Sequence, residues 1–209
     1  MPKIKSEGDD KTVFYKGGAF KVRRDVYEPA EDTLLLADNL DVKREERVLE
    51  LGTGCGILAI LAAKAGAEVV GSDINPAALR CARDNASANG VSERIDFRLG
   101  HLFEPVLGEC FDLVIFNPPY LPVEREEAIG GVLERAWEAG PDGREVIAAF
   151  LPGLPNHLVP KGRALLLQSS LSDISKTITA LKSGGFQVNV VGKKVWFEEL
   201  FLLSCKLSK

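Results

Sequence analysis

The chain has 209 residues, of which 45% are hydrophobic and 27% charged, and its net charge is −4. These values predict one folded domain over residues 1–209, with residues 1–11 flexible. The acidic balance argues against sequence-independent binding of nucleic acid, which basic surfaces drive. No apolar run reaches the ~20 residues of a membrane-spanning helix. The N-terminus lacks a signal-peptide pattern, and the four cysteines lack the spacing of a zinc site or a disulfide scaffold. We therefore expect a cytoplasmic protein without a metal site.

The first elements are predicted to be a hairpin and a helix. Residues 12–22 place apolar and aromatic side chains around Gly17-Gly18, which is typical of a short β-hairpin. The segment Tyr27–Thr33 (YEPAEDT) combines a proline, acidic residues and a following run of leucines, a pattern that marks a helix start. The residues alone leave open whether this segment only caps a helix or also contributes to a site.

A glycine-rich loop follows the first buried strand. Residues 46–51 (ERVLEL) predict the strand, and residues 57–64 predict a helix. Between them lie Gly52, Gly54 and Gly56, which let the backbone turn tightly and approach a ligand without Cβ clashes. A strand, a glycine loop and a helix in this order are typical of a nucleotide-binding site.

Two acidic residues indicate which cofactor this loop binds. Asp73 follows the second strand, at residues 67–71, where a carboxylate can accept from the two vicinal hydroxyls of a ribose. Glu50 precedes the glycines, where it suits a cationic amino-acid group and would repel the pyrophosphate of a dinucleotide. The Gly-Lys-Ser/Thr sequence of an ATP P-loop is absent from the chain. The pattern therefore favours S-adenosylmethionine over NAD or ATP.

The next strand leads to a histidine. Residues 76–89 predict a helix that Pro76 opens and Gly90 closes, and residues 94–99 alternate like an edge strand. His101 follows this strand, at the position where an adenine ring lies in such folds. The alternative is that His101 is an ordinary histidine of a surface loop.

The most informative stretch is Asn117-Pro118-Pro119-Tyr120, directly after an apolar strand at residues 111–116. Neither proline can donate to a β-ladder, so Asn117 is expected to project from a stiff backbone at the carboxyl end of the strand. The Asn117 side-chain oxygen and the Pro118 carbonyl can both accept from an incoming NH2 group. The Tyr120 ring can stack on a planar substrate. A proline-rich turn with a polar cap is the structural alternative.

The remaining elements complete an α/β fold. Residues 121–143 form a long loop that is expected to act as a lid, and Trp137 within it is either part of the lid or a packing residue. The later elements are predicted as a helix at 144–158 broken by Pro152 and Pro155, a strand at 163–168, a helix at 173–182, and strands at 186–191 and 196–205 joined by 192–194. This order predicts a Rossmann-like, doubly wound sheet of seven strands, mostly parallel, with an antiparallel C-terminal hairpin.

Six segments together narrow the identification: Val26–Thr33, Leu49–Gly56, Asp73–Pro76, Phe116–Tyr120, Ala136-Trp137 and Asp142–Glu145. Through them, nearly the whole chain resembles the class I S-adenosylmethionine-dependent methyltransferases. Within that superfamily it is similar to the HemK family of protein-glutamine N5-methyltransferases. The resemblance is strongest to the short archaeal and eukaryotic branch, which modifies translation release factors.

The resemblance implies a role for each matched residue. Thr33, Glu50, Gly52 and Asp73 would hold S-adenosylmethionine, Leu102 would contact adenine through its backbone, and Asn117 would contact both cofactor and substrate. Also counted with the cofactor site are Tyr27, Gly54, Gly56, Ile74 and His101, and with the catalytic amide site Pro118 and Tyr120. His101 stands where the family commonly has an aspartate, and a neutral imidazole offers only one acceptor nitrogen. The hairpin and helix at residues 12–40 would cover the cofactor.

The implied reaction transfers a methyl group from S-adenosylmethionine to the side-chain amide nitrogen of glutamine in the Gly-Gly-Gln loop of a peptide chain release factor. Members of the short branch often work with a small zinc-binding activator subunit, for which the edge strand at residues 94–99 offers a docking site. Three alternatives stay open at this stage. They are methylation of adenine N6 or another nucleic-acid amine, methylation of lysine or another protein side chain, and a non-catalytic S-adenosylmethionine-binding subunit.

Overall fold

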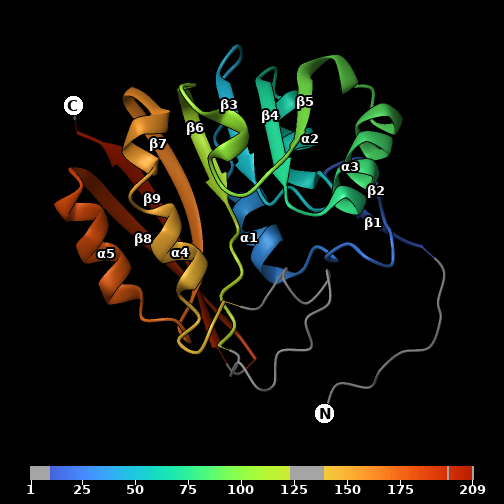
Figure 1. Cartoon of the computed structure of the whole chain (residues 1–209). Coiled ribbons are helices and arrows are strands. Elements are labelled where there is room, and N and C mark those ends of the chain that lie inside the picture. Colours follow the sequence, from blue (N-terminus) through green and yellow to red (C-terminus); the bar gives the residue numbers. More distant parts are fainter. Residues whose placement is uncertain (1–9, 123–138, 197, 209) are drawn as a thin grey trace.

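The computed structural model describes residues 10–122, 139–196 and 198–208, and Figure 1 shows a twisted sheet with helices on both faces. The strands are β1 (Lys11–Tyr15), β2 (Gly18–Val22), β3 (Arg47–Leu51), β4 (Glu68–Asp73), β5 (Ile95–Leu99), β6 (Phe111–Phe116), β7 (Leu158–Ser169), β8 (Phe186–Val195) and β9 (Glu198–Leu207). The α-helices are α1 (Glu31–Asp38), α2 (Ile57–Lys64), α3 (Pro76–Ala88), α4 (Glu145–Phe150) and α5 (Ile174–Ser183). The short 3-10 helices are η1 (Ser92–Arg94), η2 (Glu104–Val106) and η4 (Leu154–His157).

Seven strands form one sheet in the order β5-β4-β3-β6-β7-β9-β8, and β1 pairs with β2 in a separate hairpin. The strands β5, β4, β3, β6 and β7 are parallel, whereas β9 runs antiparallel to both β7 and β8. The prediction of a doubly wound, mostly parallel sheet with an antiparallel closing hairpin is therefore confirmed. The chain builds outward from β3 to β5 and then returns to place β6 on the other side of β3. Open α/β sheets bind ligands at such a reversal of strand order.

Apolar side chains fill one cluster on each face of the sheet. Val48 and Ile115 belong to the cluster that includes residues of α1, α2 and α3, whereas Phe116 belongs to the cluster that includes residues of α4 and α5. Successive side chains of a strand point to opposite faces. Glu50 therefore shares the face of Val48, toward α2, and Asn117 shares the face of Ile115, toward α1.

Asn85 of α3 ties the N-terminal hairpin to the rest of the fold. Its side-chain oxygen accepts from the Lys21 backbone N–H at 2.8 Å, and its side-chain nitrogen donates to the Cys55 carbonyl at 2.8 Å. One buried amide thus fixes the hairpin against the glycine loop. Asn75, which caps α3, also donates to the Asp25 carbonyl at 2.7 Å. These bonds position the segment that enters α1.

One predicted element is confirmed, and two predicted boundaries are wrong. β5 is an edge strand, as predicted. The helix predicted at residues 144–158 is shorter: α4 ends at Phe150, just before Pro152, and Leu154–His157 form the 3-10 helix η4. The predicted turn at residues 192–194 is wrong, because these residues lie inside β8, which pairs with β9 from Phe186↔Leu207 to Val195↔Glu198. Gly192 is one of the paired residues of this ladder, opposite Phe201. A local turn signal was overridden by the continuous ladder.

One strand starts earlier than predicted, and two predicted segments lie outside the described residues. β7 begins at Leu158, five residues before the predicted strand start at Arg163, and its pairing with β6 contains an irregularity. Residues 1–9 of the segment predicted to be flexible, and residues 123–138 of the predicted lid, including Trp137, lie outside the described part of the chain. In the described ranges, no helix is both long and apolar enough to cross a bilayer.

Candidate active site

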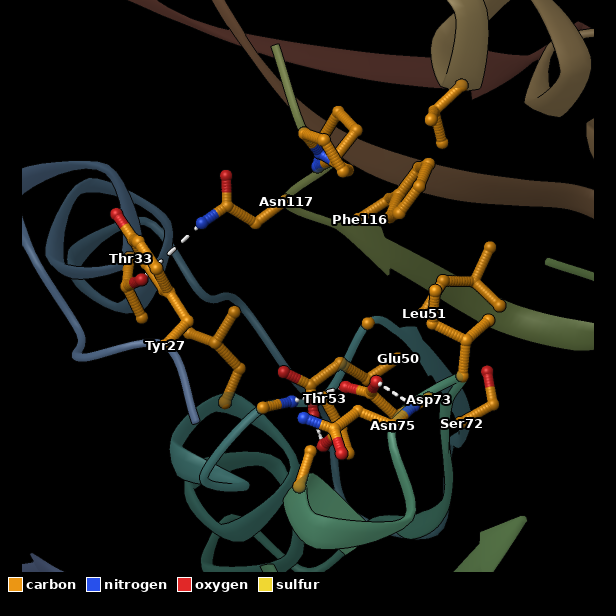
Figure 2. A pocket seen from close by; sticks show the side chains of 18 of the residues that line it. Tyr27, Thr33, Glu50, Leu51, Thr53, Ser72, Asp73, Asn75, Phe116 and Asn117 are labelled. Carbon is orange, nitrogen blue, oxygen red and sulfur yellow. Dashed lines mark hydrogen bonds between the residues drawn. The ribbon is translucent and has the colours of Figure 1, made fainter. Parts of the chain in front are cut away.

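A cavity of about 300 Å³ lies at the carboxyl ends of β3, β4 and β6. Figure 2 shows two polar groups in it: Asn117 with Thr33 and Tyr27, and Glu50 with Thr53, Asp73 and Asn75. The predicted site residues that line it are Tyr27, Thr33, Glu50, Gly52, Gly54, Asp73, Ile74, His101, Leu102, Asn117, Pro118 and Tyr120. The tertiary structure therefore brings together segments separated by up to ninety-three positions, from Tyr27 to Tyr120.

Gly56 is the one predicted site residue that is not among those lining the cavity. It precedes α2 with a φ of 85°, and a Cβ atom on it would lie 2.9 Å from the Cβ of Ala82 in α3. Gly54, in contrast, has a φ of 55° and open space where its Cβ would be. The loop thus uses Gly54 to leave room for a ligand and Gly56 to let two helices approach closely.

Glu50 is a buried acid at the end of β3, with 3% of its surface exposed. Its Oε2 accepts from the Thr53 hydroxyl at 2.5 Å and from the Ala59 backbone N–H at 3.0 Å. Burial outweighs these bonds and raises the pKa of the carboxyl to about 8, with a further contribution from the nearby Asp73. A cation in the cavity would relieve this cost by pairing with the ionised form.

Asp73 ends β4 and orients the loops on either side of it. Its Oδ2 accepts from the Gly54 backbone N–H at 2.9 Å, and its Oδ1 accepts from the Asn75 backbone N–H at 2.8 Å. Burial raises the pKa of this carboxyl, whereas the backbone bonds oppose the shift. Each carboxylate oxygen still has a second lone pair that can accept from a hydroxyl in the cavity.

His101 and Leu102 line the cavity beyond the end of β5. The His101 backbone N–H donates to Glu104 at 3.2 Å, and its side chain is exposed. Leu102 has a φ of 46°, which is uncommon for a residue other than glycine. A positive φ at this position turns the backbone sharply at the edge of the cavity.

Asn117 projects toward α1, as the alternation along β6 requires. Its Nδ2 donates to Asp32 Oδ2 at 3.0 Å and to the Thr33 hydroxyl at 3.4 Å. Its Oδ1 is buried and has no hydrogen-bond partner among the described residues. A buried amide oxygen without a donor is costly. The site therefore offers a strong acceptor that a ligand N–H can satisfy.

Two tyrosines converge on the same carboxylate. The hydroxyls of Tyr27 and Tyr120 donate to Asp32 Oδ2 at 2.9 and 3.4 Å. Burial, followed by the negative charge of Asp32, raises the pKa of both phenols well above the ordinary value. Both tyrosines therefore stay protonated as donors. The Tyr120 hydroxyl is held on one side, which leaves its ring to form part of the cavity wall.

The sequence of the chain matches a protein family and named relatives. Residues 27–137 match the family described as "Methyltransferase small domain". Over 192 residues the chain is 46% identical to a Methanocaldococcus jannaschii protein provisionally named a protein N5-glutamine methyltransferase, covering 90% of this chain and 95% of the relative. It is 37% identical to the human methyltransferase HEMK2, covering 81% of this chain and 82% of that protein.

The chain belongs to the HemK family of protein N5-glutamine methyltransferases. Among solved structures, this methyltransferase is similar to the E. cuniculi Mtq2–Trm112 complex, which is described as methylating the eRF1 translation termination factor. The TM-score is 0.69 at 28% identity, covering 88% of this chain and 99% of the other. Membership of this family makes the present chain a methyltransferase whose methyl donor is S-adenosylmethionine.

The cavity of the methyltransferase fits this donor on three observations. Open space at Gly54 lets a ligand approach the backbone. The buried Glu50 carboxyl has a raised pKa, which a cationic group would reverse. Asp73 presents two oxygens whose backbone bonds leave lone pairs free for hydroxyls.

Asp32 is the site residue that sequence reasoning missed. It was included in the motif that starts α1, but acids in the first turn of a helix usually cap it at the surface. Here Asp32 is 3% exposed and receives hydrogen bonds from four cavity residues, Tyr27, Thr33, Asn117 and Tyr120. The signal available in the sequence was the pair Asp32-Thr33 directly before the leucine run. Other lining residues that were not predicted include Asp25, Pro29, Leu51, Thr53, Ser72 and Asn75.

Proposed function

We propose that this methyltransferase transfers a methyl group from S-adenosylmethionine to the side-chain amide nitrogen of a glutamine in a peptide chain release factor. The observation that carries the proposal is the buried oxygen of Asn117 at the end of β6, which has no hydrogen-bond partner among the residues that the structure describes. A primary amide has two N–H groups and can satisfy it. The E. cuniculi relative, whose described substrate is a termination factor, supports release factors as the substrate class.

We assign the cofactor's groups to the polar residues on the β3 and β4 side of the cavity. Glu50 would pair with the cationic amino-acid end, and Asp73 would accept from the two ribose hydroxyls. Gly52 and Gly54 would leave room for the chain between them. Thr33, at the start of α1, would bind the amino-acid end from the opposite side.

The adenine ring is assigned to the β5 side of the same cavity. Ile74 and His101 would flank the ring, and the Leu102 backbone would read its edge. Tyr27 would close the cavity over the amino-acid end. Gly56 would contribute indirectly, by setting the approach of α2 and α3.

Asn117, Pro118 and Tyr120 would form the acceptor site. A glutamine amide nitrogen is a weak nucleophile because its lone pair is delocalised into the carbonyl. Asn117 Oδ1 and the Pro118 carbonyl would accept its two hydrogens, which aims the nitrogen at the activated methyl group and favours lone-pair character. Positioning of this kind supplies ~7–11 kcal/mol in favourable cases. Tyr120 would pack its ring against the planar amide, and the methylated nitrogen would lose its extra proton to water.

We also propose a small zinc-binding partner subunit docked on β5. The related E. cuniculi enzyme is described as a complex with Trm112, which supports a partner of this kind. Within the described residues β5 pairs only with β4, and Leu99 on it is 59% exposed. A free edge and an exposed apolar side chain favour strand addition. Purification of the chain with such a subunit, followed by zinc analysis of the complex, tests this part.

Mass spectrometry tests the main proposal. The protein is incubated with S-adenosylmethionine and a release factor that carries a Gly-Gly-Gln loop, with and without the partner subunit. One added methyl on that glutamine, lost in Asn117→Ala, is the expected result. Binding of the cofactor without transfer under either condition would overturn the proposal and direct attention to nucleic-acid amines or other protein side chains.

A further inference from the structure

Asp32 makes five hydrogen bonds although its carboxyl is nearly inaccessible to solvent. Its Oδ2 accepts from the Tyr27 hydroxyl, the Asn117 side chain and the Tyr120 hydroxyl. Its Oδ1 accepts from the Thr33 backbone N–H at 2.6 Å and from the Thr33 hydroxyl at 3.2 Å. One carboxylate therefore connects α1, the segment before it and the strand end that carries Asn117.

This contact decides which way the Asn117 amide faces. A carboxylate has no hydrogen to donate, so the amide nitrogen must face Asp32 and the amide oxygen must face away. The second N–H of the same nitrogen points to the Thr33 hydroxyl. Both donors of Asn117 are thus occupied, and only its oxygen is available. Figure 2 shows the Asn117 nitrogen directed toward Thr33 and its oxygen directed away.

The backbone directly after Asn117 also offers hydrogen-bond acceptors and lacks N–H donors at two positions. Pro118 and Pro119 both line the cavity, and neither has an N–H group. In the described part of the chain, Pro118 and Pro119 therefore add carbonyl oxygens and no N–H donor beside the Asn117 oxygen. Such a surface suits a group that carries two hydrogens on nitrogen, and it disfavours a carboxylate or a carbonyl oxygen, which would face unpaired lone pairs.

We propose that Asp32 is the positioning residue that gives the acceptor site this polarity, and so selects an NH2 group over a carboxylate. The inference rests on the proposed function for its substrate. It also accounts for a single transfer: the methylated amide keeps one N–H, so it can satisfy only one of the two acceptors.

The first test compares Asp32→Asn and Asp32→Ala with the wild type in three measurements. Turnover on the release factor should fall ~10–100-fold in Asp32→Ala, because a loosened amide misplaces the nucleophile. Asp32→Asn keeps one acceptor oxygen and should lose less. The affinity for S-adenosylmethionine should change less than ~3-fold in both. The matched control is Glu31→Gln, which removes the adjacent charge of the same helical turn; Glu31 pairs with Lys193 at 2.5 Å on the surface and should leave turnover unchanged.

Selectivity separates positioning from a general structural defect. A release factor whose acceptor glutamine is changed to glutamate is added as an inhibitor. It should inhibit the wild type weakly. It should inhibit Asp32→Ala several-fold more strongly relative to turnover, because the freed Asn117 amide can rotate and present its N–H groups. Equal relative inhibition in both proteins would overturn the proposal.

A spectroscopic measurement keeps the inference testable if no release factor is methylated. The side-chain NH2 signals of Asn117, assigned by their loss in Asn117→Ala, should exchange slowly with water in the wild type and rapidly in Asp32→Ala. Slow exchange in both would refute the role of Asp32 whatever the substrate. The wild type could exchange slowly and Asp32→Ala rapidly while the wild type methylates no release factor. That result would support the role of Asp32 and refute the proposed function. If Asp32→Ala does not fold, Asp32→Leu carries the same comparison, because a leucine of similar size also offers no acceptor.

Discussion

Replacing Glu50 by glutamine should stabilise the protein in the absence of cofactor, by an amount that grows with pH. Burial raises the pKa of the Glu50 carboxyl from 4.5 to about 8. In the unfolded chain the same carboxyl ionises near its ordinary value. Between these two pKa values the folded protein holds a proton that the unfolded chain has released. Its stability therefore falls as the pH rises through this range, and the loss is complete above the folded pKa.

The size of the effect follows from the pKa difference. One pKa unit corresponds to about 1.4 kcal/mol, so a shift from 4.5 to about 8 sets an upper limit of about 5 kcal/mol above that pH. A glutamine oxygen can accept the same bonds from Thr53 and Ala59, and it does not titrate. The stability advantage of Glu50→Gln should thus increase by about 1.4 kcal/mol per pH unit from about pH 5 to pH 8 and then level off.

The assay is urea-induced unfolding of both proteins without cofactor across this pH range. Glu46→Gln is the control of opposite sign. Burial raises the pKa of Glu46, but the hydrogen bonds from Arg163 and from the Lys43 backbone N–H, together with the positive charges of these two residues, outweigh burial and lower the pKa. That ion pair contributes above the ordinary pKa and is lost in acid, so Glu46→Gln should be destabilised at neutral pH. A stability difference between Glu50→Gln and wild type that does not vary with pH would refute a neutral, buried Glu50.

The same substitution should harm function while it helps folding. A glutamine cannot pair with a cation, so the affinity of Glu50→Gln for S-adenosylmethionine should fall at least ~10-fold in calorimetry. A buried acid of this kind destabilises the free protein but stabilises the bound cofactor, which is a trade-off between stability and function. Unchanged affinity would show that Glu50 only supports the loop through its bonds to Thr53 and Ala59.

Three further outcomes are expected. Asn117→Ala should lower turnover at least ~100-fold with little change in cofactor affinity; near-normal turnover in steady-state kinetics would eliminate the amide clamp. Gly56→Ala should cost about 2–4 kcal/mol in urea unfolding, because its Cβ would meet Ala82 at 2.9 Å in a backbone of positive φ. Gly90→Ala, with positive φ but open space, should cost only about 1 kcal/mol, and equal losses would exclude the clash. Asp73→Asn should weaken cofactor binding at least ~10-fold, because its NH2 group can accept neither from a ribose hydroxyl nor from the backbone N–H that faces it; binding that is unchanged in calorimetry, beside a loss of stability in unfolding, would show a purely structural role.

The sequence by itself determined the elements whose signal is local. Strand β3 is a short apolar run, and the glycine loop follows it directly, so their order and the position of Glu50 could be read from neighbouring residues. Prolines after β6 marked its end, because a residue without an N–H cannot extend a ladder. Alternation along residues 94–99 identified the edge strand. The candidate site could be listed because parallel strands place their carboxyl ends at one edge of the sheet.

Only the tertiary structure decided how those residues act on one another. Asp32 and Asn117 are 85 positions apart, and their contact depends on the position of the start of α1 at the carboxyl end of β6. The role of Gly56 depends on the distance between α2 and α3. The position of the turn after Val195 depends on the register in which β8 pairs with β9. Burial, hydrogen-bond direction and pKa are set by atoms brought close from distant parts of the chain. A sequence pattern identifies the functional side chains, but the residues packed around them in the folded protein decide how they are oriented.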